Sequence, residues 1–198
     1  MPFNIENFKS QGLRQGGARP TQFEVDITMP AGVGAQVAPR VKFLVTAASL
    51  PSFIVEPVVV PYFGRQIKFS GDRVFQDWQV TCMNDEDFAL RNAFETWSNK
   101  MNTLISNQLD PDMWSDKYKT VANVTQFGKS GQKIRKYDFY GIFPTQVDNI
   151  GLQWDAINQI ESFGINFSYD YFVLDVDVIA PEMGDNPYMP VINSTTGN

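Results

Sequence analysis

Two short acidic runs are the part of this sequence whose residue types and spacing come nearest to a metal site. Asp85, Glu86 and Asp87 are consecutive, and Asp110 and Asp112 flank a proline. Consecutive side chains at the start of a helix point in different directions, so the first run favours helix capping over metal binding. The second run has the spacing that opens a calcium loop but lacks the later Gly and Glu that complete one. Neither run predicts a metal site.

Catalytic groups of the usual kinds are scarce. The chain has no histidine, which removes the commonest general base and metal ligand. Its single cysteine, Cys82, excludes an intramolecular disulfide and a finger-type zinc site, and fits folding in a reducing cytoplasm. No phosphate-loop or dinucleotide-binding motif occurs, and nothing singles out a carboxylate pair for glycoside hydrolysis. We therefore expect no enzyme, no catalytic residue, no metal and no cofactor.

A basic cluster beside aromatic side chains surrounds an expected turn at residues 128–131. A nucleic-acid site would use these cations for phosphates and these rings for stacking. The other interpretations are a solvated turn and a contact with an acidic patch on a neighbouring subunit. We prefer the neighbouring subunit, because the chain has a net charge of −6. The cluster consists of Lys129, Lys133, Arg135, Lys136, Tyr137, Phe139 and Tyr140.

A strand that passes into a helix is the central element that must position these side chains. Alternation from Trp78 to Cys82 predicts a half-buried strand with a buried, unreactive thiol. From Leu90 to Met101, apolar residues recur at helical spacing and predict an amphipathic helix that covers a sheet. Asn84 is the expected N-cap, with the acidic run at the positive end of the helix dipole. The predicted core contains Trp78, Leu90, Phe94, Trp97, Phe163, Ile165 and Phe167.

The remaining pattern is that of many short strands. We expect Ile67 and Phe69 to point inward, and the prolines at 51, 57 and 61 to mark an edge strand or an extended segment. Residues 108–117 should form a surface loop, and residues 144–158 should be irregular. These features predict a mainly β protein, a β-sandwich or small barrel with one flanking helix. Strands are expected at 22–29, 40–47, 65–70, 118–127, 132–140, 163–171 and 174–179.

One domain accommodates this chain of 198 residues. We expect a β-domain at 21–180, an N-terminal arm at 1–20 that is mobile or orders against a neighbour, and a flexible tail at 181–198. A short helix is expected near residues 5–11. No apolar run reaches the length of about 20 residues that crosses a membrane, and no signal peptide is recognised.

The segment GDRVFQDWQVTCMNDE (71–86) resembles the tail tube (major tail tube) proteins of contractile-tailed bacteriophages. Similar blocks lie upstream, at ARPTQFEVDI (18–27), Leu50-Pro51, VEP (55–57) and PYFGRQIKFSGDR (61–73), and downstream, at GIFPTQVDNIGLQWDAINQIESFGINFSYDYF (141–172). The resemblance implies hexameric rings, each closing a continuous β-barrel, that stack into a hollow tube inside a contractile sheath. DNA would pass through this tube without tight binding. The loop at 107–117 and the chain after Val173 depart from the family's pattern.

The same resemblance implies partners and a location. The partners would be other copies of the chain, the tail sheath protein, and baseplate and tail terminator proteins, with no membrane. Assembly would take place in the host bacterial cytoplasm and the product would lie in the virion tail. The alternatives are the tube of a related secretion or bacteriocin-type injection system and, from another class, a β-sandwich carbohydrate-binding module.

Subunit contacts are expected where arginine and aromatic side chains gather near strand ends. For the segment from Arg73 to Asp77, the alternative is a salt bridge within the domain. The channel wall should be neutral to acidic, with Asp and Glu outnumbering Lys and Arg there, and the cluster at 129–136 should lie away from it at a subunit or sheath contact. The candidate interface residues are Arg65, Asp72, Arg73, Asp77, Trp78, Lys133 and Arg135.

Overall fold

The computed structural model describes residues 5, 8–12, 17–34 and 36–175. Half of the predicted arm, the tail at 181–198 and the end of the strand expected at 174–179 lie outside these residues. The division into arm, domain and tail therefore stays a prediction. Residues Phe8–Gly12 form one short π-helical turn. Within the described part of the chain, no helix is long and apolar enough to span a membrane.

Nine strands and three α-helices follow one another in the described residues, and the mainly β expectation with a flanking helix is confirmed. One seven-stranded sheet has the order β1-β6-β7-β8-β5-β2, with β9 paired to β7, and β3 and β4 form a separate pair. The strands are β1 (Phe23–Ile27), β2 (Val45–Ala48), β3 (Phe53–Tyr62), β4 (Arg65–Phe75), β5 (Trp78–Met83), β6 (Thr120–Phe127), β7 (Lys133–Val147), β8 (Ser162–Ser168) and β9 (Tyr171–Asp175). The helices are α2 (Ala38–Leu44), α3 (Ala89–Met101) and α4 (Ser115–Tyr118).

The long strand β7 folds this sheet into two facing layers. Its first half pairs with β6 and β9, and its second half, from Phe143 to Val147, pairs with β8. Gly141, at the change of partner, has φ 69°, a conformation that suits glycine. The indole of Trp78 on β5 stacks on the ring of Phe139 on β7 at 4.4 Å, so the two layers meet in one core.

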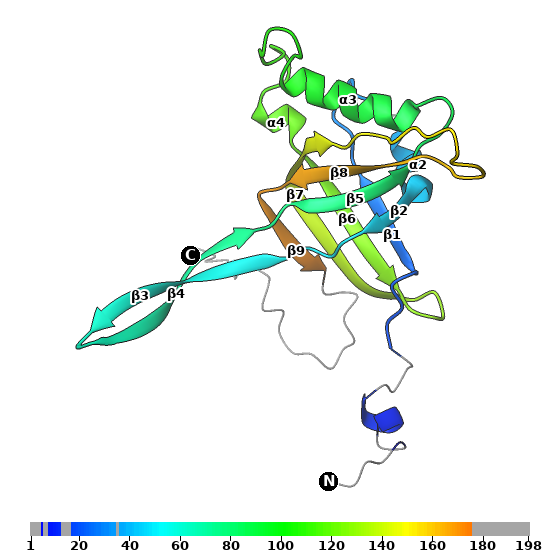
Figure 1. Ribbon diagram of the computed structural model, residues 1–198. Helices are drawn as coiled ribbons and strands as arrows, with labels where there is room; N and C mark the ends of the chain where they lie inside the picture. The colour runs from blue at the N-terminus through cyan, green and yellow to red at the C-terminus, as the bar shows by residue number, and fades with distance from the viewer. Residues whose placement is uncertain (1–4, 6–7, 13–16, 35, 176–198) are drawn as a thin grey trace, which may run out of the picture.

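Helix α3 closes one open end of the sandwich (Figure 1). Leu90, Phe94 and Trp97 are fully buried, and the ring of Phe94 meets that of Phe167 edge-on at 5.8 Å. The indole nitrogen of Trp97 donates to the carbonyl of Tyr118 at 3.1 Å, which fixes the end of α4. Burying a large apolar side chain contributes about 1.5–3 kcal/mol, so this face holds the helix on the sheets. The seven predicted core residues are all buried, with exposed fractions of 2% or less.

The start of α3 differs from the expectation. The helix begins at Ala89, and its N-cap is Phe88 at φ 52°, so the assignment of Asn84 as N-cap is wrong. The Asn84 amide instead donates to Glu161 at 3.0 Å, across to the start of β8. Asp87 accepts from the backbone amide of Ala89 at 3.2 Å and supplies the capping interaction from a position outside the helix.

The strand expected at 40–47 is also wrong in its first half, because Ala38–Leu44 is helix α2. Val41 is buried and Phe43 is 81% exposed. Alternation over five residues does not separate a strand from a short helix with one buried position. A proline in the first turn favours the helix, because its fixed φ is that of a helix start.

Three smaller expectations also need correction. Ile67 and Phe69 do not point inward, since both side chains are exposed on the β3–β4 hairpin. The segment expected to be irregular from residue 144 belongs to β7 as far as Val147. Tyr171 does not share the buried face of β8, because the chain turns at Asp170 and Tyr171 begins β9, 48% exposed.

Candidate assembly surfaces

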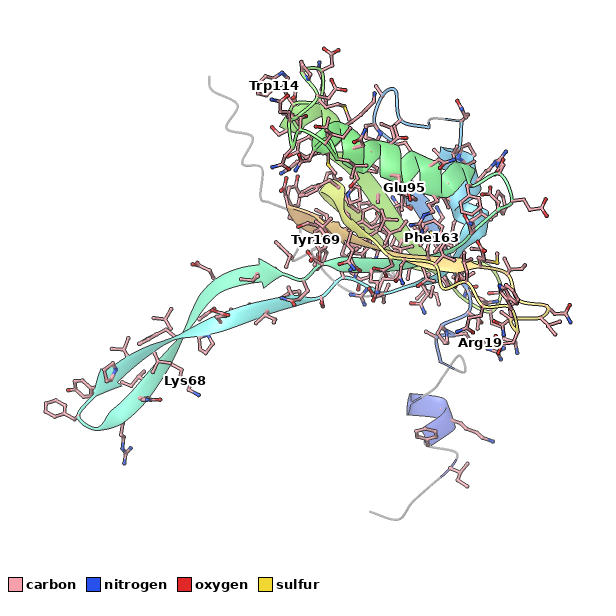
Figure 2. The ribbon with its side chains drawn as sticks, turned by 45° about the horizontal axis from the view of Figure 1, so that its top comes forward. Arg19, Lys68, Glu95, Trp114, Phe163 and Tyr169 are labelled. Atoms are coloured by element: carbon pink, nitrogen blue, oxygen red, sulfur yellow. The ribbon has the colours of Figure 1, made fainter. Side chains whose placement is uncertain are left out.

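The outer part of the β3–β4 hairpin is a large exposed surface in the described part of the chain. Every residue of β3 is exposed, and the hairpin projects away from the sandwich (Figure 1). Its outer part carries apolar side chains on both faces (Figure 2). A long exposed strand pair of this kind is unstable in water by itself unless another chain covers it. The exposed apolar side chains of its outer part are Val58, Val59, Val60, Tyr62, Phe63, Ile67 and Phe69.

A second surface is the outer face of the sheet formed by β2, β5, β8 and the second half of β7. These segments contain no charged residue in a chain with 16 Lys and Arg and 22 Asp and Glu. Their exposed residues are small or polar: Thr46 and Ala47 on β2, Gln79 on β5, Thr145 and Gln146 on β7, and Ser162 on β8. One carboxylate from outside these strands reaches the same face, because Asp148 lies against Gly164 of β8 and accepts a hydrogen bond from the Gln146 amide. Sheet faces in contact with water normally carry charged side chains. The lack of charged residues in these four strand segments therefore indicates that this face does more than meet bulk solvent.

This sheet has two free edges. Within the described residues, β2 pairs on one side only, with β5, and residues 143–147 of β7 pair only with β8. Neighbouring strands in it are all antiparallel. The two edges therefore run in opposite directions, and the β2 edge of one copy can continue the sheet at the β7 edge of another with antiparallel pairing.

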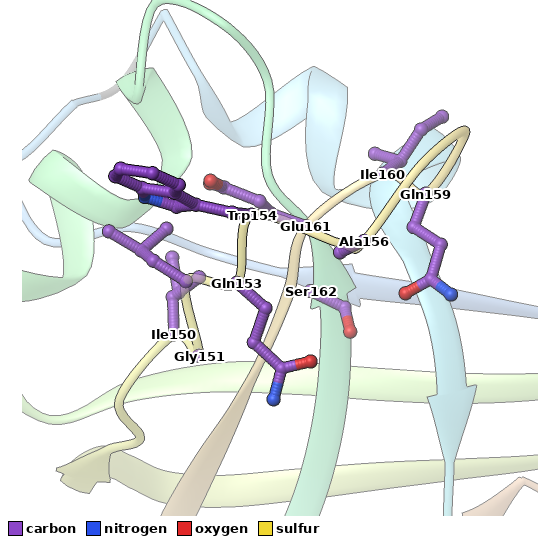
Figure 3. A pocket seen from close by; sticks show the side chains of 10 residues that line it. Ile150, Gly151, Gln153, Trp154, Ala156, Gln159, Ile160, Glu161 and Ser162 are labelled. Carbon is purple, nitrogen blue, oxygen red and sulfur yellow. The ribbon is translucent and has the colours of Figure 1, made fainter.

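The loop between β7 and β8, residues 148–161, is a third surface, and Figure 3 shows it closely. It surrounds a hollow of about 410 Å³, with Ile150 and Trp154 on one side and Gln159 and Ile160 on the other (Figure 3). Leu152, Trp154, Ile157 and Ile160 are more than 70% exposed. Sequence analysis did not identify this surface, although four large apolar side chains in a segment without strand alternation were a usable signal.

The predicted interface residues on the hairpin share one element. Arg65, Asp72 and Arg73 all lie on β4 and are exposed. The guanidinium of Arg73 lies over the ring of Phe53 at 4.4 Å, which leaves its outer face open. No ion pair engages Arg65 or Asp72 among the residues that the structure describes.

The other predicted interface residues are not gathered with these. Trp78 is 1% exposed, and its indole nitrogen donates to the carbonyl of Ser49 at 2.7 Å, so it belongs to the core. Asp77 is exposed and forms no salt bridge with Arg73 in the described structure. Lys133 and Arg135 lie at the start of β7, beside the 128–131 turn, and Arg135 stacks on Tyr137 at 5.3 Å.

Two titratable groups in the core have raised pKa values. Burial raises the pKa of the Cys82 thiol to about 12, which keeps it protonated and unreactive. Burial, with the negative charge of Asp77, raises the pKa of Tyr169 to about 12. Both groups are held neutral by packing, as structural core groups are.

Exposed ion pairs join helix α2 to the acidic run at residues 85–87 and to strand β1. Arg40 contacts Asp85 at 3.1 Å and Asp87 at 2.9 Å, and its hydrogen bond lowers the pKa of Asp87. Lys42 contacts Glu24 and Asp26 on β1. The acidic run thus pairs with a neighbouring helix, and no group of His, Cys, Asp and Glu side chains fit to hold a metal occurs in the described part of the chain.

A comparison with known protein families shows to which family this chain belongs. The family model of the phage tail tube protein matches residues 18–175. The chain belongs to the phage tail tube protein family. Tail tube protein gp19 of Enterobacteria phage T4 is 32% identical over 156 residues, which cover 78% of this chain and 90% of that protein.

Solved structures show the same fold at lower sequence identity. The tube-terminating cap of the anti-feeding prophage has a TM-score of 0.57 at 15% identity, covering 80% of this chain and 91% of that one. A chain of an extracellular contractile injection system, in a sheath-tube complex, has a TM-score of 0.52 at 13% identity, covering 87% and 98%. The tail tube family is a structural family and not an enzyme family, so this chain is a structural component of a virion tail.

Proposed function

We propose that this tail tube protein forms hexameric rings that stack into a hollow tube inside a contractile sheath, and that DNA passes through the tube during ejection. Assembly in the host bacterial cytoplasm and contacts with sheath, baseplate and tail terminator proteins belong to the same proposal. Solved relatives of the same fold come from a sheath-tube complex, a baseplate and a tube cap.

The observation that carries this proposal is the uncharged sheet with two free edges. An isolated protein with free, exposed edges risks unspecific pairing. A ring of copies that joins the β2 edge to the β7 edge removes both of these edges and forms one continuous barrel. The core covers the inner face of this sheet, so its other face, which carries Thr46, Gln79 and Thr145, becomes the channel wall.

This wall suits a channel that conducts DNA without retaining it. Proteins gain affinity for DNA chiefly by placing Lys and Arg on phosphates and releasing counterions. The four segments supply no Lys or Arg, and also no Asp or Glu. These segments support a neutral to acidic channel wall. The cluster at 129–136 lies outside this sheet, in the turn before β7 and at the start of β7.

Electron microscopy of the purified full-length chain tests the proposal. We expect hollow rings or tubes with sixfold symmetry, and Ala47→Lys should abolish them, because a lysine on the β2 edge opposes strand pairing. The matched control is Ala31→Lys, the same change at an exposed loop residue, which should assemble as the wild type does. Compact particles with no channel, or rings that Ala47→Lys leaves intact, would contradict the proposal.

The tube of a related injection system remains the alternative function. The injection-system structures share 15% identity or less, which supports a common fold and no more. The phage T4 relative shares 32% identity over most of both chains. This difference favours a phage tail, and genome-containing particles that carry the chain would establish it.

A further inference from the structure

Helix α3 runs alongside the free edge of β7 (Figure 1), and a groove of about 630 Å³ lies between the two. Residues 144–147 of β7 form one side of this groove, and Arg91, Glu95 and Ser98 of α3 form part of the other. A second hollow of about 340 Å³ continues it toward Phe143, because Met101 lines both. The apolar part of the groove's lining comes from Met101, Leu104, Pro144 and Val147.

The opposite edge of the same sheet carries a large apolar side chain that the described residues leave open. Phe43, on α2, is 81% exposed and lies two residues before β2 begins. Val41 and Leu44 on the same helix pack in the core, so they hold α2 in place while Phe43 meets water. An exposed aromatic side chain next to a free strand edge has the composition of an interface centre.

The direction of the strands brings Phe43 of one copy to the groove of another. The pairings of β2 with β5, β5 with β8, and β8 with β7 are all antiparallel. The β2 edge of one copy therefore runs antiparallel to the β7 edge that it joins. Val45, the first residue of β2, then lies beside the last residues of β7, and α2 lies at the same end, near Val147.

The two helices also lie on the same side of the sheet. Lys42 of α2 pairs with Asp26 on β1, which belongs to the opposite layer of the sandwich. Helix α3 buries Phe94 in the core between these layers. Near the start of α3, Arg91 donates to the carbonyl of Asp148 at 3.0 Å, just past the end of β7. Joined edges thus place α2 of one copy beside the first half of α3 of the next.

We propose that Phe43 of one copy inserts into the groove between α3 and β7 of a second copy, its neighbour in the ring. This inference rests on the proposed function and names the side chain that fixes the joint between two strand edges. Strand β2 has four residues, so its backbone supplies few hydrogen bonds to a neighbour. Backbone pairing alone specifies register weakly, whereas a buried aromatic side chain adds apolar contact and admits one register.

Disulfide cross-linking in the full-length chain tests this contact. The native Cys82 is buried and unreactive, so two introduced cysteines report by themselves. After oxidation, Phe43→Cys with Glu95→Cys should give covalent oligomers of up to six copies on a non-reducing denaturing gel, because a ring contact closes on itself. The matched control is Phe43→Cys with Thr96→Cys. Thr96 is exposed, lies about 100° further around α3 and does not line the groove, so this pair should stay monomeric.

The pattern of oligomers separates this inference from the proposed function. Equal cross-linking by both pairs would overturn the inference, and so would monomer alone from the Glu95 pair while the wild-type chain forms rings. Oligomers that continue beyond six copies would place the contact between rings and would overturn it as well. Each of these results leaves the proposed ring intact. A wild-type chain that forms no rings would overturn the proposed function and this inference together.

Removing the aromatic ring tests how much the contact contributes to assembly. Phe43→Ala removes a side chain that the isolated subunit exposes, so folding should not change. The fraction of subunits in rings, measured by sedimentation at a fixed concentration, should fall about tenfold. Val121→Ala, at a residue of β6 that is 44% exposed in the other layer, is the control and should form rings as the wild type does. Rings of equal abundance from the two variants would exclude Phe43 from the joint.

Discussion

Trp78 is the side chain that joins the two layers of the sandwich. It stacks on Phe139 at 4.4 Å, meets Phe167 at 5.7 Å and donates to the carbonyl of Ser49. Its polar nitrogen is satisfied while its ring is buried, which is the condition for burying an indole without a desolvation cost. Trp78 lies three residues after the end of the exposed β3–β4 pair, so the boundary of the core is sharp.

Phe94 gives a direct test of the core at the residue scale. We expect Phe94→Ala to lower the free energy of unfolding of the unassembled subunit by about 3–5 kcal/mol, because it leaves a cavity between α3 and β8. Chemical denaturation measures this change. The control is Phe43→Ala, an exposed phenylalanine on α2 that should cost less than about 1 kcal/mol. A similar loss in both variants would mean that the α3 face is not the core.

Tyr169 gives a prediction for alkaline pH. In the unfolded chain its phenol ionises near the ordinary pKa of 10.0, whereas in the folded chain burial and Asp77 raise the pKa to about 12. The folded state thus keeps a proton that the unfolded state loses, and stability falls as the pH rises from about 10 to about 12. Tyr169→Phe should remove about 1–3 kcal/mol of this pH dependence. Denaturation curves across this pH range give the free energy of unfolding of both proteins. If it falls equally with pH in both, the raised pKa of Tyr169 is wrong.

At the scale of elements, the β3–β4 hairpin contrasts with the β6–β7 hairpin. The strands β6 and β7 pair through register from Thr120 to Phe127 and bury Ala122 and Val124. The β3–β4 pair has ladder bonds over a similar length, but almost all of its residues are exposed. The β6–β7 hairpin therefore stabilises the subunit, whereas the β3–β4 hairpin is exposed to contact by other copies.

Shortening the β3–β4 hairpin tests this separation. Replacing residues 57–70 by an Asn-Gly turn should change the free energy of unfolding by less than about 0.5 kcal/mol, because these side chains contact little of the sandwich. Tube assembly should be lost, because the shortened chain no longer offers this exposed apolar surface to a neighbouring copy. Denaturation and electron microscopy together measure both effects. A loss of several kcal/mol would mean that the hairpin stabilises the subunit itself.

At the scale of the whole molecule, charge is distributed unevenly. The net charge is −6, yet the sheet proposed as the channel wall contains no charged residue. Electrostatic binding to DNA rises with each cation placed on phosphates, and one lysine per copy would be repeated along the entire tube. A neutral wall avoids this accumulation of affinity.

This distribution predicts how assembled tubes treat DNA. Wild-type tubes should bind duplex DNA no more tightly than about 10⁻⁴ M at physiological salt. Gln79→Lys, which adds a cation to the exposed face of β5, should tighten binding at least about tenfold and make it dependent on salt. Ala31→Lys adds the same charge to a loop outside the sheet and is the control. Equal DNA affinity of the two variants would show that β5 does not line the channel.

The sequence by itself determined the elements whose patterns are local and long. Alternation in β5 and helical spacing from Leu90 to Trp97 predicted both elements and their buried faces, because one side of each must meet a core. The blocks around Gly71 also predicted the family, which the family match at 18–175 confirms. The segments at 40–44 and 84–88 were assigned wrongly, because five residues carry too little periodicity to separate competing structures.

Only the tertiary structure decided which apolar side chains face water. Ile67 alternates as Val80 does, but β4 pairs with β3 alone, outside the sandwich, whereas β5 lies between β8 and β2. An alternating pattern states that one face needs a partner and does not state whether that partner is in the same chain. For the β3–β4 hairpin, whose side chains are exposed, no local pattern in the sequence can distinguish a surface that another chain covers from one that the chain's own core covers.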